Sequence, residues 1–411
     1  MRSAILAFCF LTTLAAGILP AVEPGILPGG TAVGAPSTPP GGRMPPSTAG
    51  ETPAATNAPG RPILLAFYHP WYGTPWGSAQ SWHKWDSYSF PGRYHPERIK
   101  ANGRRDIASG DYPLIGPYDQ GDREVVRWHF RLAKGAGIDG FLCSWWKSNR
   151  PGMMSGWQAD LFENVLLPVA QEENFKVAVI DENAHYQQDY GQLVSRITTY
   201  LPRYAAHPAY LRMKGQPVWF IYQVWDDWLT AAQAASYIEA AESRVGDIYW
   251  IFDRLRTSLS GEPPGVRMDV APEWLKLKKI DCFGTYSYFG HWRDVAPATL
   301  DKLYAGFARQ VHEAGHAVQL PLSPGHDNTA VHDAPLVLPR RDGALLKAFL
   351  HAIDAAQPDV AVVCSFNEWY EMTEVEPSAT WSDPYLYLKV IAEWRGRTWE
   401  RPALPQGPLN R

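Results

Sequence analysis

The segment ILLAFYHPWYG at residues 63–73 begins the folded part of the chain. Its opening run, ILLAFY, is apolar and rich in β-formers, which is typical of a strand that is buried on both faces. The turn that follows, HPWYG at 69–73, has no glycine-rich pattern that could hold a phosphate group. A doubly wound nucleotide-binding sheet would place such a pattern after its first strand. The segment therefore argues against the doubly wound sheet, which is the main rival among α/β folds.

Similar apolar runs recur along the chain after the first one, at residues 140–145, 176–181, 217–222, 248–253, 281–286, 317–323 and 361–366. Amphipathic stretches alternate with them, at 122–136, 159–173, 192–205, 230–244, 297–314, 342–356 and 384–394. Strands that alternate with helices predict a parallel sheet, and eight such units in one domain predict a (β/α)₈ TIM barrel. The fifth unit is the weakest, because Pro263 and Pro264 leave room for only a short helix.

The first residues of the chain have the pattern of an export signal. Arg2 precedes an apolar run at residues 4–19, and small residues near Ala21 suit a cleavage site. The run is short for a spanning helix and no basic stop follows it, so a retained anchor is disfavoured. We therefore predict a signal peptide at 1–21 and a secreted or periplasmic mature protein without a membrane span.

The segment after the signal is dominated by proline, glycine, alanine, serine and threonine. This stretch, residues 22–61, lacks the apolar content that folding requires, and it predicts a disordered linker. The barrel domain is expected at 62–398, followed by a loose C-terminal tail at 399–411.

Composition narrows the classes of partner. The chain carries 38 Lys and Arg against 42 Asp and Glu, a net charge of −4, so it lacks the basic excess of nucleic-acid-binding proteins. Its 18 Trp outnumber its 15 Phe. Trp and Tyr combine a flat face with a polar group, and an excess of them indicates surfaces that stack on ligands.

The cysteines predict buried thiols. Cleavage of the signal would remove Cys9 and leave Cys143, Cys282 and Cys364, each within an apolar run. An odd number in an exported protein does not make a disulfide framework.

The residues at the predicted strand ends point to a carbohydrate. A barrel places its chemistry at the C-terminal ends of its strands. Aromatic rings, amides and carboxylates gather there, and rings suit the C–H faces of sugars while planar polar groups suit hydroxyls. We predict an oligo- or polysaccharide as partner, with these substrate-binding residues: Tyr68, Trp71, Tyr72, Trp145, Trp146, Glu182, Tyr222, Tyr286, His326, Asp327 and Asn367.

The strongest catalytic candidates lie in FNEWYE at residues 366–371. Glu368 and Glu371 are three positions apart, so a helical turn would bring their Cβ atoms to about 5–6 Å. Glycoside hydrolysis uses two carboxyl groups, about 5–5.5 Å apart in retaining enzymes. Neither the fourth nor the seventh predicted strand ends in a carboxylate, so the eighth strand is expected to supply both catalytic groups.

Several motifs resemble glycoside hydrolase family 99, the endo-α-mannosidase family. FYHPWYG at 67–73 is similar to its FYYPWYG, and YPLIGPY at 112–118 to its YPxLGPY. AGIDG at 136–140 with SWW at 144–146 is similar to its second strand, and PGHD at 324–327 to PGYDD. SFNEWYE at 365–371 resembles SFNEWHE, and VEP at 375–377 the IEP that follows. The likeness runs from about residue 62 to 394, so residues 62–398 are expected to form a glycoside hydrolase domain.

The resemblance implies a retaining enzyme, independent of metals and other cofactors, that cuts inside α-mannosyl chains. The sugar's own 2-hydroxyl would act as nucleophile through a 1,2-anhydro intermediate. Glu368 would then be the base toward that hydroxyl, and Glu371 the general acid/base.

The sequence departs from the family at several positions. Tyr370 replaces the His between the two glutamates, and Met372 replaces the Gly after them. After the third predicted strand, the family has Glu-Pro-Tyr, whereas this chain has Glu-Asn-Ala at residues 182–184. His332 lies near a position where the family has arginine. These changes fall in substrate-contacting loops, so a family-99-like glycosidase acting on a different polysaccharide stays an alternative.

Three rival classes compete with this interpretation. A metal hydrolase is disfavoured, because no HExxH or paired-ligand spacing accompanies the histidines. A non-catalytic carbohydrate-binding barrel would bind sugar with both glutamates dispensable. A serine nucleophile is disfavoured, since no G-x-S-x-G motif is present.

Overall fold

The computed structural model describes residues 61–87, 89–146, 156–183, 191–224, 229–254, 256–258, 267–287 and 297–405. The predicted signal peptide, nearly all of the predicted linker and the end of the tail lie outside the described residues.

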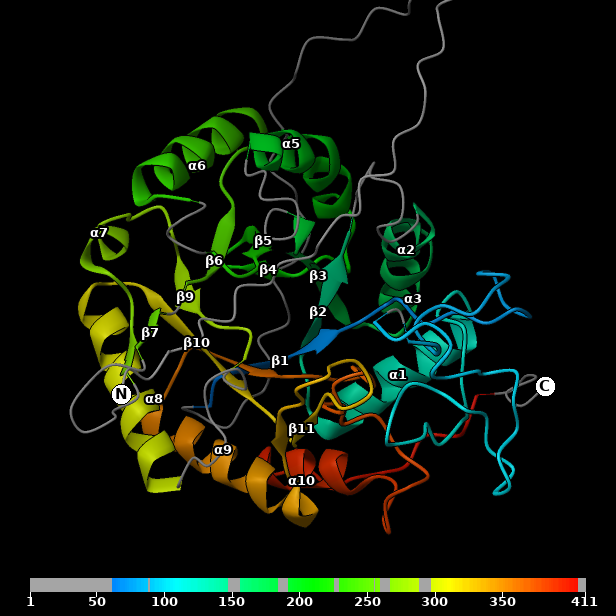
Figure 1. The fold of residues 1–411 in the computed structure, drawn as a ribbon. Helices are drawn as coiled ribbons and strands as arrows, with labels where there is room; N and C mark the ends of the chain where they lie inside the picture. The colour runs from blue at the N-terminus through cyan, green and yellow to red at the C-terminus, as the bar shows by residue number, and fades with distance from the viewer. Residues whose placement is uncertain are drawn as a thin grey trace, which may run out of the picture. The chain divides into compact units, whose positions relative to one another are not determined.

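The described part of residues 62–398 is built on a closed parallel barrel (Figure 1). Its strands, in barrel order, are β1 (Ile63–Tyr68), β2 (Gly140–Trp145), β3 (Lys176–Asp181), β5 (Gln216–Ile221), β6 (Tyr249–Asp253), β9 (Cys282–Gly284), β10 (Ala317–Leu322) and β13 (Val360–Val363). Each strand is parallel to both neighbours, and the pairing of β1 with β13 closes the ring. The (β/α)₈ TIM barrel predicted from the sequence is confirmed.

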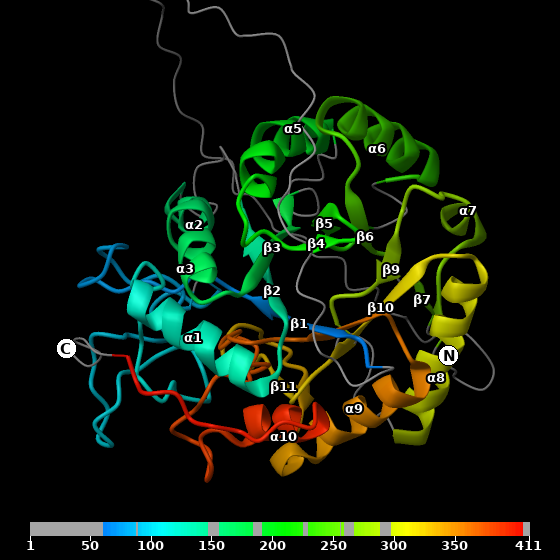
Figure 2. The ribbon, with the colours of Figure 1, turned by 180° about the vertical axis from the view of Figure 1, so that it is seen from behind.

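The helices surround the barrel, as the two opposite views show (Figures 1 and 2). They are α1 (Arg123–Ala136), α2 (Gly156–Leu161), the π-helical turn η1 (Phe162–Leu166), α3 (Leu167–Glu172), α5 (Gly191–Ala205), α6 (Ala231–Val245), α7 (Pro272–Leu275), α8 (Pro297–Glu313), α9 (Ala344–Ala356) and α10 (Leu386–Trp394). The weak fifth unit has the short helix α7, as expected from its prolines. None of the described helices is long and apolar enough to cross a membrane.

Small elements that the sequence pattern did not indicate decorate this frame. They are β4 (Arg212–Met213), the hairpin strands β7 (Arg256–Ser258) and β8 (Arg267–Asp269), the pair β11 (His326–Asp327) and β12 (Val337–Leu338), and the 3₁₀ turn η3 (Arg341–Gly343).

Local chemistry explains the elements that flank the site. The side chain of Asp122 caps α1 by accepting from the backbone N–H of Glu124, and Gly137 ends this helix with a φ of 86°. Strand β1 is apolar on both faces because it is covered by the barrel interior and by the helices. Phe67 points inward, where its ring lies 5.6 Å from that of Phe220. Tyr68, the next residue, therefore points outward.

The three cysteines of the barrel are buried free thiols, as predicted. Cys143, Cys282 and Cys364 are all 1% exposed or less. They belong to the core of the barrel.

Candidate active site

The two candidate glutamates lie in the loop that follows β13. The loop folds back on itself, because the backbone N–H of Ser365 donates to the carbonyl of Thr373 and that of Glu376 donates to Phe366. The backbone N–H of Glu368 donates to Ser365 Oγ at 2.8 Å. The Glu368 side chain is only 4% exposed, whereas that of Glu371 is 34% exposed. One carboxyl group is thus enclosed, and the other faces solvent.

Glu368 is held from two directions. Its Oε1 accepts from the backbone N–H of Tyr370 at 3.1 Å, and the hydroxyl of Tyr72 lies 3.5 Å away. Its Oε2 is buried and has no hydrogen-bond partner among the described residues. Burial and the nearby Glu371 raise the pKa of Glu368 well above its usual value, while the positive charge of Lys84 lowers it.

A wall of rings borders Glu368. The Nε2 atom of His69 lies 3.8 Å from Glu368 Oε2 and 3.1 Å from the hydroxyl of Tyr286. Tyr286 in turn meets the ring of Tyr222 edge-on at 5.2 Å. Burial and the charge of Lys84 lower the pKa of His69 to about 3, so this imidazole is neutral in ordinary buffers.

Asn367 fixes the backbone on which His69 sits. Its Oδ1 accepts from the backbone N–H of His69 at 2.8 Å, and its Nδ2 donates to the His69 carbonyl at 3.1 Å. The ring of His69 stacks on that of Trp71 at 4.7 Å. The loop after β1 and the loop after β13 are therefore joined directly beside Glu368.

The loop after β10 supports Glu371. The backbone N–H of Asp327 donates to the Glu371 carbonyl at 2.8 Å, and His326 Nδ1 lies 3.8 Å from Glu371 Oε2. The Asp327 carboxylate accepts from the backbone N–H of Thr329 at 3.0 Å. Asp327 thus acts mainly through the loop it shapes, while His326 faces the partly exposed glutamate.

The end of β3 adds a third acidic group. Glu182 is 5% exposed, and burial raises its pKa to about 8, against the opposing effect of a hydrogen bond with Ser144 and the charge of Lys84. Burial therefore favours the protonated form of Glu182, which can donate a hydrogen bond to a ligand.

The sequence analysis did not predict Lys84 as a residue of the site. The ammonium of Lys84 lies 4.6 Å from the centre of the Trp71 ring and 5.1 Å from that of Tyr370. Its loop, between β1 and α1, lies far in sequence from any strand end. The aromatic-rich composition of that loop was the only signal that could have drawn attention to it.

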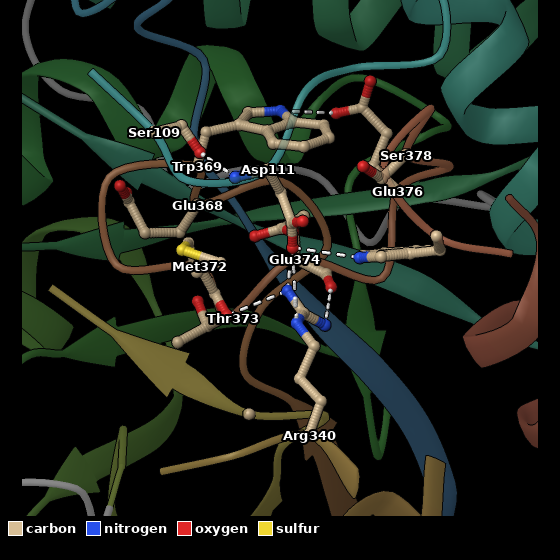
Figure 3. Close-up of polar contacts among 12 residues, drawn as sticks. Ser109, Asp111, Arg340, Glu368, Trp369, Met372, Thr373, Glu374, Glu376 and Ser378 are labelled. Atoms are coloured by element: carbon tan, nitrogen blue, oxygen red, sulfur yellow. Dashed lines mark hydrogen bonds and ion pairs between the residues drawn. The ribbon is translucent and has the colours of Figure 1, made fainter. Parts of the chain in front are cut away.

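Arg340 supports the loop of the candidate glutamates (Figure 3). Its Nη2 lies 2.6 Å from Glu374 Oε1 and donates to the carbonyl of Met372 at 2.8 Å, while Nη1 donates to the Glu374 carbonyl at 2.9 Å. Glu374 is fully buried, and burial raises its pKa, which Arg340 opposes. These contacts fix the segment that follows Glu371.

A second network lies behind the loop, around Glu376. This buried carboxylate accepts from the hydroxyl of Tyr118 at 2.7 Å and from Trp369 Nε1 at 3.0 Å, a contact also drawn in Figure 3. His129 Nε2 lies 3.2 Å from its other oxygen. The network holds the indole of Trp369, a residue that lies between the two glutamates in the chain.

Two predicted substrate-binding residues lie away from this site. Tyr68 stacks on Phe141 at 4.7 Å, and its hydroxyl pairs with His129 Nδ1 at 2.9 Å. Trp145 packs against Trp219 at 5.6 Å, and its Nε1 donates to the hydroxyl of Tyr204 on α5. Our prediction for both was wrong, because both side chains point from their strands toward the covering helices.

Trp146, the neighbour of Trp145, lies beyond the end of β2. It is 7% exposed, and its Nε1 donates to Ser144 Oγ at 3.0 Å. Ser144 is also the hydrogen-bond partner of Glu182, so Trp146 is placed on the same side as the site.

A parallel (β/α)₈ barrel whose rim joins two glutamates, neutral hydrogen-bonding groups and aromatic rings is the kind of site that glycoside hydrolases use. The sequence profile of glycosyl hydrolase family 99 matches residues 61–243. The chain resembles family 99 over this range and is a glycoside hydrolase, so its substrate is a glycan.

Known proteins support this assignment. The chain is 25% identical over 380 residues to a human glycoprotein endo-alpha-1,2-mannosidase-like protein, covering 80% of this chain and 74% of that protein. It is 24% identical over 373 residues to the rat glycoprotein endo-alpha-1,2-mannosidase, covering 81% and 74% respectively. The solved structure of the GH99 endo-alpha-mannosidase from Bacteroides thetaiotaomicron has the same fold, with a TM-score of 0.61, 22% identity, and coverage of 81% of this chain and 96% of that one.

Proposed function

We propose that the protein is a secreted or periplasmic retaining glycosidase that cleaves α-linked, mannose-type glycans within the chain. The observation that carries the proposal is the pairing of an enclosed Glu368, which has one oxygen without a hydrogen-bond partner among the described residues, with a partly exposed Glu371. Such an oxygen can accept a hydrogen bond from a sugar hydroxyl.

In the proposed first step, Glu368 Oε2 accepts the proton of the sugar 2-hydroxyl. The 2-oxygen attacks the anomeric carbon, and the bond to the leaving oxygen breaks as Glu371 protonates that oxygen. In the second step, Glu371 takes a proton from water, which opens the 1,2-anhydro ring at the anomeric carbon, and the 2-oxygen recovers its proton from Glu368. Two inversions in sequence retain the anomeric configuration.

The electrostatics suit Glu368 as the base. A sugar hydroxyl is a weak acid, and a carboxylate with a raised pKa is a better proton acceptor than an ordinary one. Burial and Glu371 supply that increase in pKa, while the charge of Lys84 and the backbone N–H of Tyr370 oppose it. The neutral His69 adds no positive charge beside Glu368 near neutral pH.

The choice of α-mannosyl substrates rests on the relatives, which are named endo-alpha-1,2-mannosidases. The Tyr370 and Met372 replacements lie beside the glutamates, so a family-99-like activity on a different polysaccharide is the alternative within the same chemistry. The predicted export signal at residues 1–21 is the basis for the proposed location.

The test is a screen of the purified protein against α-mannans and other α-linked polysaccharides, with product sizes and the anomer of the first product measured. Oligosaccharide products with retained configuration support the proposal. Binding of a polysaccharide without hydrolysis would instead favour a non-catalytic carbohydrate-binding barrel.

A further inference from the structure

The loop between β1 and α1 brings one cation into the group of carboxyls at the barrel rim. Lys84 has a left-handed backbone conformation, with a φ of 60°, which residues other than glycine adopt rarely. Its ammonium lies over two aromatic rings, 4.6 Å from the centre of Trp71 and 5.1 Å from that of Tyr370. Rings in this position hold a cation by their quadrupoles.

Both rings are close to Glu368 through neighbouring residues. Trp71 stacks on His69, whose Nε2 is 3.8 Å from Glu368 Oε2. Tyr370 is two residues after Glu368, and its backbone N–H donates to Glu368 Oε1 at 3.1 Å. Lys84 thus lies over two rings, and each ring is linked to a residue that contacts or approaches Glu368.

We propose that Lys84 is a positioning residue whose ammonium, held between Trp71 and Tyr370, balances the charge of the enclosed Glu368 carboxylate so that it can act as base. The proposal rests on the proposed function, because it assigns a role to Lys84 in that reaction. It also explains why tyrosine stands at position 370, where the family has histidine, since the Tyr370 ring forms one side of the site that holds the Lys84 ammonium.

The charged and titratable groups around this pair come from several loops. Glu182, Glu371 and Asp86 act on Lys84 together with Glu368, and burial opposes them, so that the pKa of Lys84 is lowered to about 8. Glu371 and Glu182 raise the pKa of Glu368, and its other neighbours are the neutral His69 and Tyr72. Lys84 therefore supplies a positive charge among acidic groups, and with a pKa of about 8 it is mostly protonated at pH 7.

The sign of the effect is specific. Removing the ammonium raises the pKa of Glu368 further, so the ionised base is lost at a higher pH as the solution is acidified. In Lys84→Met, we expect the acid limb of the kcat/KM profile to move up by about one pH unit, so that kcat/KM falls about tenfold on that limb. Lys84→Arg keeps the charge, and its profile should stay close to that of the wild type.

A second lysine offers a matched control. Lys214 also has a left-handed backbone, with a φ of 49°, and its ammonium lies 5.8 Å from the centre of the Tyr249 ring. It precedes β5, at the end of the barrel opposite the site. Lys214→Met should leave the acid limb unchanged, which separates the loss of this charge from the loss of any stacked lysine.

A direct titration keeps the test independent of the substrate. The infrared difference spectrum between the wild type and Glu368→Gln assigns the carboxylate band of Glu368, and its pH dependence gives the midpoint of this group. The same difference, with and without Glu368→Gln, is measured in the Lys84→Met and Lys84→Arg backgrounds. An upward shift of the Glu368 midpoint in Lys84→Met alone supports the proposal. An unchanged midpoint in folded Lys84→Met overturns it, even where the wild type hydrolyses mannans.

Absence of hydrolysis by the wild type would contradict the proposed function instead, and the titration would still measure the charge effect. Should Lys84→Met not fold, Lys84→Gln is titrated by the same criterion.

Discussion

The hydroxyl of Tyr72 lies 3.5 Å from Oε1 of Glu368, although 296 positions separate the two residues in the chain. The same hydroxyl accepts from the backbone N–H of Trp369 at 2.9 Å. Since Tyr72 follows β1 and Glu368 follows β13, the contact spans the pair of strands that closes the barrel. The loop after β1 thus supplies the hydroxyl group that binds the loop after β13.

Replacing Tyr72 by Phe should weaken the proposed base without disrupting the fold. The variant loses one contact to Glu368 and one to the Trp369 backbone, each worth about 1 kcal/mol. We expect kcat/KM to fall about five- to thirtyfold, with a small loss of thermal stability. A variant that retains full kcat/KM would show that this hydroxyl does not support Glu368.

The two glutamates should respond differently to the leaving group. Glu371→Gln removes the proton donor, so natural glycosidic bonds should be affected far more than an activated aryl glycoside, which needs little protonation. Glu368→Gln should reduce turnover of both by about 10²-fold or more. Comparing kcat on the two substrate types for each variant provides the check, and full activity in the double variant would move the chemistry elsewhere on the rim.

Arg340 should make a large, pH-dependent contribution to stability. Arg340→Met leaves Glu374 buried without its cation, which costs about 3–5 kcal/mol when the carboxylate is charged. The folded-state pKa of Glu374 is raised by burial, so folding favours its protonated form, and removal of Arg340 raises that pKa further. The loss of Tm should therefore be smaller at pH 5 than at pH 8, and an equal loss at both would contradict this reading. Glu374→Gln, which removes the charge but keeps the shape, is the control.

Glu182 offers a separate test by pH. Its folded-state pKa of about 8 is above the usual value of a glutamate, so its burial favours folding with the proton bound. The wild type should lose stability from this group as pH rises from about 4.5 to 8. Glu182→Gln imitates the protonated form, and its Tm should rise relative to the wild type across that range. Denaturation curves at several pH values measure the trend, and a constant difference would disprove it.

The two neighbouring tryptophans should separate folding from binding. Trp145→Ala removes a ring packed against Trp219 and should destabilise the barrel by about 3–5 kcal/mol while leaving KM close to normal. Trp146→Ala should fold well and weaken binding of oligosaccharides. Thermal unfolding and isothermal titration of each variant give the two measurements.

Much of the barrel could be predicted from alternation alone. The bounds of β1, β2 and β3 agree with the sequence pattern, because strands buried on both faces are unbroken apolar runs. The prediction for the last strand extended to residue 366, whereas β13 ends at Val363. Phe366 stays fully buried and its N–H donates to Phe67, so hydrophobicity continues after the ladder has ended.

The site could be predicted only in part. The strand-end rule identified the segment of Glu368 and Glu371, but it did not reveal which face of each strand carries Tyr68 or Trp145. The inward or outward phase of a strand depends on the partners across the barrel, and an unbroken apolar run does not show it. Lys84 escaped the rule altogether, because a long loop returns it to the rim.

The closing pair of strands also has a consequence for biosynthesis. Tyr72 and His69 are made early, whereas Asn367 and Glu368 are made after nearly the entire barrel. A ribosome-bound chain that has not yet reached β13 has the aromatic wall but neither glutamate. Under the proposed mechanism, such a chain cannot hydrolyse a glycan until residues 368–371 have been made and joined to the loop after β1.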